Sequence, residues 1–189
     1  MSSNISAILM AAGFSRRMGG DKLFLSYRGK TLIGHALCLL DKLPVFEKII
    51  VSTAERLEKL ELPRGVRAVT NLYPQRGQSE SIRLGLWVTS GQWYLFLNAD
   101  QPKLDVSALL PMLELTKNNP GKIIYPVVNG KPCSPVLFHK NFRNSLLTIT
   151  GDEGGKSLRE ANAWACVPYH TEKPELFIDV DTPEDIKNI

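Results

Sequence analysis

The sequence predicts an α/β fold in which helices cover both faces of a mainly parallel sheet. Short apolar runs rich in β-branched residues alternate with longer segments of helical period, which is the order of elements typical of this class. The most apolar run, residues 93–100, ends in Asp100. Open α/β sheets bind ligands at the carboxyl ends of such central strands. The length of 189 residues predicts one domain, residues 1–189, since domains commonly contain about 150 residues.

The first half of the chain alternates strands and helices regularly. A helix is predicted to begin at Thr31 and to end before Pro44. Residues 55–62 predict a short polar helix, and apolar residues at helical spacing predict a longer one over 79–90, which Gly91 ends. The strands expected between these helices are the short apolar or β-branched runs 5–10, 48–53, 66–70 and 93–100.

The second half is less regular. Residues 106–115 predict a helix. Residues 122–128 and 135–139 predict two antiparallel strands at one edge of the sheet, because Asn129-Gly130 between them is a hairpin signal. The remaining expected elements are two short helical segments on either side of residues 151–155, late strands over 164–169 and 176–180, and a terminal helix capped by Asp181 or Thr182.

Composition and charge exclude several classes of protein. Lys and Arg number 23 against 19 Asp and Glu, and 43% of residues are hydrophobic, as in an ordinary globular protein. The chain contains no apolar run of the roughly 18–20 residues that a membrane span needs and no signal peptide, so we expect a cytoplasmic protein without membrane partners. No run of Lys and Arg predicts nucleic-acid binding. Cys38, Cys133 and Cys166 are too far apart to predict a disulfide framework or a zinc site.

A small-residue loop with three cations, residues 11–22, follows the first strand. Small residues let backbone amides approach an anion, and the side chains of Arg16, Arg17 and Lys22 carry the positive charge that favours a compact anion such as a nucleoside triphosphate. A Walker loop would need Gly-Lys-Ser/Thr at its end, and the dinucleotide fingerprint would need glycine in place of Ser15. From spacing alone, an ordinary surface loop with a few arginines remains the alternative.

The motif LMAAGFSRRMGGDK resembles the signature of the MobA-like nucleotidyltransferases. The segments GQSESIRLGL, NADQP and IDVDTPEDI resemble three further motifs of that family, in the same order. The resemblance implies a Rossmann-like, three-layer α/β/α fold of the nucleotide-diphospho-sugar transferase type with a mixed, mostly parallel sheet. Within the family, the chain is most similar to molybdenum cofactor cytidylyltransferases, because of Ala12 and the Gln-Pro that follows Asp100.

This resemblance implies a Mg²⁺-dependent transfer of CMP from CTP to the phosphate of molybdopterin, with release of pyrophosphate. Arg17 and Lys22 would neutralise charge on the polyphosphate, and Asp100 would ligate Mg²⁺. Asp179 is the expected second ligand, and Asp181, whose capping of the terminal helix would explain its presence, is the competing one. The residues expected to bind the nucleotide are Ala11, Ala12, Gly13, Ser15, Asn71, Gly77, Ser79 and Ser81.

Each expectation at the nucleotide site has an alternative. The backbone amides at the start of the helix around Ser79 are expected to face an anion, although simple capping of that helix explains Ser79 and Ser81 equally well. The acceptor half departs from the family pattern at Ala99 and at Cys133-Ser134-Pro135. The alternative functions are therefore transfer to a sugar or polyol phosphate, use of GTP, or delivery of the finished cofactor to an apo-molybdoenzyme.

Overall fold

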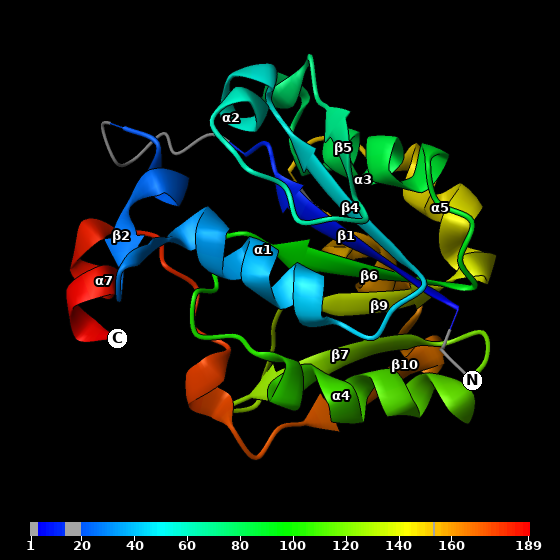
Figure 1. Ribbon diagram of the computed structural model, residues 1–189. Helices are drawn as coiled ribbons and strands as arrows, with labels where there is room; N and C mark the ends of the chain where they lie inside the picture. The colour runs from blue at the N-terminus through cyan, green and yellow to red at the C-terminus, as the bar shows by residue number, and fades with distance from the viewer. Residues whose placement is uncertain (1–3, 14–19, 153) are drawn as a thin grey trace.

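The computed structural model describes residues 4–13, 20–152 and 154–189, and an eight-stranded sheet forms the centre of this part of the chain (Figure 1). The order along the sheet is β10-β7-β9-β6-β1-β4-β5, with β8 paired to β7. A separate two-stranded ribbon pairs β2 with β3. The strands are β1 (Ile5–Ala11), β2 (Ser26–Tyr27), β3 (Lys30–Thr31), β4 (Glu47–Ser52), β5 (Val66–Thr70), β6 (Trp93–Asn98), β7 (Ile123–Val128), β8 (Lys131–Pro132), β9 (Val136–His139) and β10 (Cys166–His170).

Most neighbouring strands of the sheet are parallel, as expected, but the antiparallel strand is not at an edge. β9 lies between β6 and β7 and is antiparallel to both. The predicted turn at Asn129-Gly130 is present, with φ of 50° and 76°, but it joins β7 to the short β8. β7 and β9 do pair, with Ile124 opposite Leu137. The hairpin signal therefore located the turn correctly, whereas the position of β9 depends on long-range packing.

The helices form a layer on each face of the sheet. α1 and α4 lie on the face toward the viewer in Figure 1, and α3 and α5 lie behind it. The predicted cap of α1 is confirmed, because Thr31 Oγ1 accepts a hydrogen bond of 3.1 Å from the amide of Gly34. The α-helices are α1 (Leu32–Lys42), α2 (Ala54–Glu58), α3 (Gln78–Trp87), α4 (Val106–Glu114), α5 (Arg143–Thr148), α6 (Lys156–Ala161) and α7 (Pro183–Asn188). The 3-10 turns are η1 (Lys22–Phe24), η2 (Pro74–Arg76), η3 (Leu115–Lys117), η4 (Lys140–Phe142), η5 (Ala163–Ala165) and η6 (Pro174–Leu176).

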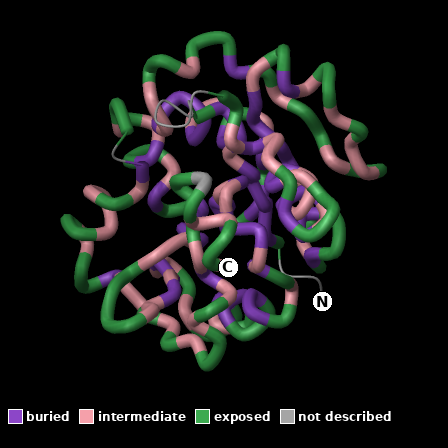
Figure 2. Tube along the Cα trace, turned by 90° about the vertical axis from the view of Figure 1, so that its left-hand side faces the viewer, coloured by how far each residue is buried: buried purple, intermediate pink, exposed green. Residues whose placement is uncertain are grey.

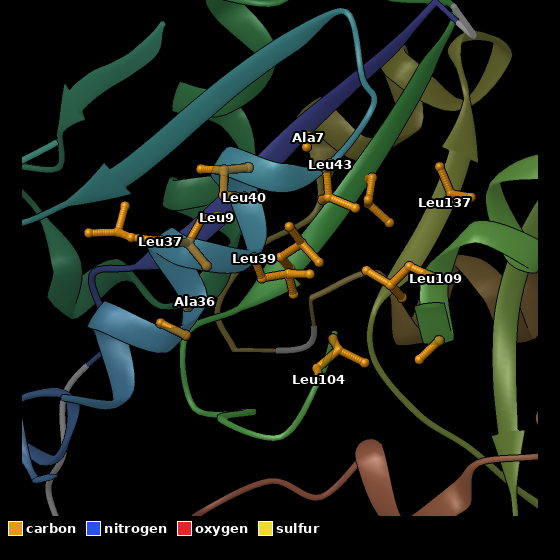
Figure 3. Close-up of a cluster of buried hydrophobic side chains, with 14 of the residues drawn as sticks. Ala7, Leu9, Ala36, Leu37, Leu39, Leu40, Leu43, Leu104, Leu109 and Leu137 are labelled. Atoms are coloured by element: carbon orange, nitrogen blue, oxygen red, sulfur yellow. The ribbon is translucent and has the colours of Figure 1, made fainter. Parts of the chain in front are cut away.

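Alternation along β1 divides the core into two main clusters. Ala7 and Leu9 pack with α1 and α4 in one cluster, and Ile8 packs with α3 and α5 in the other. Figure 3 shows the first of these, where leucines of α1 face Leu109 of α4 and Leu137 of β9. Figure 2 shows the burial along the chain, with buried segments gathered inside the molecule and exposed segments around them. This packing holds the carboxyl ends of β1 and β6 rigidly next to each other.

Three predicted elements differ from the structure. The helix predicted over 79–90 ends at Trp87 with Val88 as its C-cap, so Gly91 does not end it. Residues 176–180 are not a strand, because after β10 the chain crosses the ends of the strands instead of extending the sheet. The amide of Val180 donates one hydrogen bond of 2.9 Å to the carbonyl of Asp100, and the side chains of Phe177 and Val180 are buried. The polar helix predicted over 55–62 is shorter and ends at Glu58.

The terminal helix α7 is capped by Thr182 and not by Asp181. The side chain of Thr182 accepts from the amide of Asp185, and the carboxylate of Asp185 accepts from the amide of Thr182, which together form a capping box. α7 packs beside β2 through a small cluster that contains Tyr27 and Val180 (Figure 1). Among the described residues, no helix combines the length and apolar character needed to cross a membrane.

Candidate functional site

A pocket of about 510 Å³ opens at the carboxyl ends of β1 and β6. It lies where open α/β sheets bind ligands, as the position of Asp100 in the sequence predicted. Its lining includes both polar and apolar side chains from segments far apart in the sequence. These are chiefly Met10, Ala11, Ala12, Gly13, Lys22, Gly77, Gln78, Ser81, Asn98, Asp100, Asp152 and Asp181.

The small residues that follow β1 line this pocket, as expected. Ala11 and Ala12 are buried, with 1% and 2% of their surface exposed, whereas Gly13 is exposed. A Cβ atom built on Gly13 would find no atom of the described residues within 4 Å. The described residues therefore leave space beside the Gly13 backbone. The predicted residues Ser15 and Arg17, together with Arg16, lie outside the described residues.

Lys22 brings together the loop and two acidic segments. Its Nζ donates to Asp100 Oδ2 at 2.8 Å, to the carbonyl of Val180 at 2.9 Å and to Asp181 Oδ1 at 3.2 Å. Burial would lower the pKa of Lys22, but the charges of Asp100 and Asp181 and its hydrogen bonds to them outweigh burial and raise the pKa. Lys22 therefore stays positively charged in the pocket.

Three carboxylates lie close together at this position. Burial, followed by the negative charges of Asp100 and Asp181, raises the pKa of Asp179 to about 6. Asp181 is largely exposed, with its carboxylate bound to Lys22, so the capping role that competed with a site role for this residue is wrong. Asp100 and Asp181 both line the larger pocket, whereas Asp179 lines a neighbouring one.

These carboxylates fit a divalent cation that also binds nucleotide phosphates. Asp100 Oδ1 is buried without a hydrogen-bond partner among the described residues. Mg²⁺ prefers one or two carboxylates plus phosphate oxygens and water, rather than a complete set of protein ligands. In the described part of the chain, no three His, Cys, Asp or Glu side chains form a complete metal site. A metal at Asp100 would therefore complete its coordination with oxygens from a substrate or from water.

The start of α3 differs from the expectation that its amides face an anion. The amide of Gln78 donates to Asp152 Oδ1 at 3.2 Å, and the amide of Ser79 donates to the carbonyl of Gly151 at 3.1 Å. Gly77 has φ of 86°, and a Cβ atom there would lie 2.4 Å from the carbonyl carbon of Gly151. Residues 151–152 thus occupy the donors of α3, which sequence spacing did not reveal.

The predicted polar residues around α3 have unequal access to the pocket. Ser81 lines it, whereas Ser79 is fully buried and its hydroxyl donates to the carbonyl of Arg76. Asn71 is 2% exposed and lies behind the wall, where its Nδ2 donates to Ser81 Oγ at 3.2 Å. Asn71 therefore orients Ser81 and does not line the pocket itself.

A second pocket of about 300 Å³ adjoins the first and shares Met10 and Gln78 with it. Lys156 and Arg159 supply positive charge to its lining, and Asp179 supplies a carboxyl group. Its other lining residues include Cys133, Ser134 and Gly155. Burial, followed by the charge of Asp179, raises the pKa of the Cys133 thiol to about 11. Cys133 is therefore a neutral wall residue.

Asn98 lies at the junction of the two pockets. Its Nδ2 donates to Ser134 Oγ at 3.1 Å, and its Oδ1 accepts from Gln78 Nε2 at 3.5 Å. Sequence reasoning missed Asn98 as a site residue, although it lies two positions before Asp100 on the same strand end. Asn98 is the last residue of β6 and Asp100 follows it in a turn, so a polar residue at a strand end was the signal that could have found it.

Arg56 is a second residue that sequence reasoning missed. It is only 7% exposed, although it comes from the short polar helix α2. Its guanidinium binds the carboxylate of Asp21 and the carbonyls of Ala11 and Gly13. Nothing in the local pattern indicated this role, since isolated arginines on a short helix are usually exposed.

Most of the chain matches a known protein family. The family model described as the MobA-like NTP transferase domain matches residues 7–167. The chain is 25% identical over 191 residues to the probable molybdenum cofactor guanylyltransferase of Bacillus cereus strain Q1, covering 97% of this chain and 94% of the relative.

Solved structures share the fold. The crystal structure of Rv0371c from Mycobacterium tuberculosis H37Rv superposes with a TM-score of 0.83 at 19% identity, covering 100% of this chain and 98% of that one. A manganese complex of Rv0371c superposes with a TM-score of 0.79 at 18% identity, covering 97% and 96% of the two chains.

Proposed function

Since the chain belongs to the MobA-like NTP transferase family, we propose that it transfers CMP from CTP to the terminal phosphate of a molybdopterin-type acceptor. An oxygen of the acceptor phosphate attacks the α-phosphorus, the bond from that phosphorus to the bridging oxygen breaks, and pyrophosphate leaves with the electron pair. Such a transfer depends mainly on positioning and on neutralisation of charge. The family supports nucleotidyl transfer, and the finer assignments of base and acceptor are part of the proposal.

The single observation that carries the proposal is the contact of Lys22 with Asp100 and Asp181 in a pocket lined by small residues. A cation and carboxylates at one point are the groups that a metal-bound polyphosphate needs. Backbone groups of Ala12 and Gly13 would bind the nucleotide, and Lys22 would bind the phosphates. Asp100 and Asp179 would hold Mg²⁺, which supplies further neutralisation of the polyphosphate charge. Asp181 is the alternative second ligand.

The smaller pocket is the proposed acceptor site. Lys156 and Arg159 give it the positive charge that an acceptor phosphate requires. Because the two pockets meet at Gln78 and beside Asn98, an acceptor phosphate in the smaller one would face the α-phosphate of a nucleotide in the larger one. This arrangement supports an in-line attack at the junction.

CTP is the proposed nucleotide because Ala12, one of the residues that carry the resemblance to cytidylyltransferases, lines the pocket. GTP is the second candidate, since the curated relatives are named guanylyltransferases. The two candidates share all of the phosphate chemistry and differ only in the base.

The decisive experiment measures pyrophosphate release by the purified protein with Mg²⁺ and either CTP or GTP, with and without molybdopterin. We expect release that requires molybdopterin and is faster with CTP. Faster release with GTP would overturn the base assignment alone. Release with a sugar or polyol phosphate in place of molybdopterin would overturn the acceptor, and no release with any combination would overturn the proposed function.

A further inference from the structure

The buried guanidinium of Arg56 contacts both ends of the loop that follows β1, at residues 11–13 and at Asp21. Its Nη1 donates to the carbonyl of Ala11 at 2.6 Å, and its Nη2 donates to the carbonyl of Gly13 at 3.0 Å. At the other end of the loop, Nε and Nη2 donate to the two carboxylate oxygens of Asp21 at 2.5 and 2.9 Å. Four hydrogen bonds from one side chain therefore span residues 11–21.

The backbone of Arg56 is itself fixed to the sheet. α2 follows β4 directly, and Thr53 caps it by accepting a hydrogen bond from the amide of Arg56. On the loop side, Asp21 Oδ1 also accepts from the amide of Leu23, which starts the turn η1 at Lys22. Arg56 thus connects the sheet to the residue that precedes Lys22.

A buried guanidinium is costly unless its donors are satisfied. Its planar set of N–H groups matches a carboxylate and two carbonyls at once, which a lysine ammonium cannot do from the same position. Arg56 is also absent from the lining of the larger pocket. Among the described residues, its guanidinium donates to the loop, and it would act on a ligand through the loop.

We propose that Arg56 is a positioning residue for nucleotide transfer, which holds Gly13 and Lys22 at the separation at which both reach the same polyphosphate. This inference rests on the proposed function, in which residues 11–13 and Lys22 bind the nucleotide. It assigns to α2 a part in nucleotide binding that the larger pocket alone does not indicate.

The test compares Arg56→Lys with Arg67→Lys in the full-length protein. Arg67 is a matched control, because it is an exposed arginine of β5 whose ion pair is with Glu47, on another part of the chain. The measurements are the Kd of CTP and GTP with Mg²⁺, kcat and KM for pyrophosphate release, and the melting temperature. Each substitution is also made in a Lys22→Ala background, and assays run well below every melting temperature.

We expect Arg56→Lys to lower kcat/KM by about 10²-fold, since small displacements of positioning groups have effects of this size, and to raise the Kd of the nucleotide. In the Lys22→Ala background the same substitution should have a much smaller effect, because Arg56 acts partly through Lys22. Arg67→Lys should leave Kd and kcat/KM unchanged in both backgrounds.

Three results would overturn the inference. One is an unchanged Kd and kcat/KM in Arg56→Lys. Another is a loss that is equal in the two backgrounds, and the third is a lowered melting temperature with unchanged nucleotide affinity, because these describe a residue that only supports the fold. If the unsubstituted protein bound neither CTP nor GTP, the proposed function itself would fall first, and the inference with it.

Discussion

Lys22 lies between Asp100 and Asp181 and donates to both carboxylates. These acidic residues are 78 and 159 positions away in the sequence, so only the fold brings them to Lys22. The two carboxylates keep Lys22 positively charged, because their charges and hydrogen bonds raise its pKa and outweigh the opposing effect of burial. The proposed chemistry depends on that fixed positive charge more than on any other single side chain.

Lys22→Ala should lower kcat for pyrophosphate release by roughly 10²-fold or more, because it removes charge stabilisation from the transition state. Steady-state pyrophosphate release with the preferred nucleotide and acceptor measures this. Lys117→Ala is the control. Lys117 is exposed, lies in η3 after α4, and pairs with Glu114, the last residue of α4. Equal kcat in Lys22→Ala and the unsubstituted protein would remove Lys22 from the mechanism.

Gly13 and Gly77 both line the pocket but should respond oppositely to alanine. At Gly13 an added Cβ meets no atom of the described residues within 4 Å, so Gly13→Ala should leave the free energy of unfolding unchanged. A methyl group crowding a bound ligand costs about 1–3 kcal/mol, so the nucleotide Kd should rise about tenfold. Isothermal titration with the Mg²⁺–nucleotide complex measures the Kd, and unaltered affinity would show that the ligand does not approach Gly13.

At Gly77 the same substitution should damage the fold. The φ of 86° disfavours alanine, and the new Cβ would lie 2.4 Å from the carbonyl carbon of Gly151. Gly77→Ala should therefore lower the free energy of unfolding by about 1–3 kcal/mol. Urea unfolding of Gly77→Ala and Gly13→Ala under the same conditions measures the contrast, and equal stabilities would contradict it.

Single residues also show what the sequence can predict about the site. Lys22, Asp100 and the small residues of the loop could be predicted to lie near one another because a cationic loop and an acidic strand end are local signals, and all of them line the larger pocket. Arg56 and the smaller pocket's Lys156 and Arg159 were not found, because their roles follow from which segments the fold places together. A polar residue on a short helix has the same local pattern whether it faces water or a buried carboxylate.

Glu47, the first residue of β4, links three elements. Its carboxylate accepts hydrogen bonds from the Ser6 hydroxyl in β1 and from the amide and hydroxyl of Ser90 after α3. Burial would raise the pKa of Glu47, but these hydrogen bonds outweigh burial and lower it. A pKa lowered by folding stabilises the native state at pH values above the ordinary glutamate pKa, and the stabilisation is lost as pH falls through the folded value.

Glu47→Gln should therefore lower the free energy of unfolding by about 1–2 kcal/mol at pH 7, with the difference shrinking below about pH 4. Urea unfolding from pH 3 to 7 measures this dependence. Glu58→Gln, at an exposed glutamate of α2, is the control and should show no such difference. A stability difference that stays constant with pH would contradict the role of the ionised carboxylate.

Helices with strong boundary signals were predicted more closely than the segment at residues 176–180. Thr31 predicted the start of α1 correctly, because its hydrogen bond to Gly34 is local. Residues 176–180 have the apolar composition of a strand, but β10 already occupies the edge of the sheet, and the side chains of Phe177 and Val180 are buried against other elements. The apolar composition of these residues predicts that they are buried. It does not distinguish a strand from an irregular segment that crosses the ends of the strands.

The three-layer architecture was predicted because many local signals agree. Alternating apolar runs and helical segments leave few arrangements in which every apolar face is covered. The interior position of β9 was not predicted, since β6 and β9 are separated by α4 and β7 in the chain and pair only in the finished sheet. Long-range pairing of this kind has no signal in a short window of sequence.

Ligand binding should stabilise the whole molecule. At a concentration of about 100 times Kd, the Mg²⁺–nucleotide complex should raise the free energy of unfolding by about 2.7 kcal/mol. Thermal unfolding with nucleotide, with and without Mg²⁺, measures the effect. Asp100→Asn should abolish the part of the shift that depends on Mg²⁺, and Asp41→Asn, at an exposed residue of α1, should retain it. A Mg²⁺-dependent shift that persists in Asp100→Asn would exclude Asp100 as a ligand.

The hydrogen bond from Val180 to the carbonyl of Asp100 places part of the site in a segment made after every strand of the sheet. Removing the residues after β10 would leave every strand of the sheet in the chain but would remove Asp179 and Asp181. The acidic part of the site therefore depends on a final segment that the sheet itself does not contain.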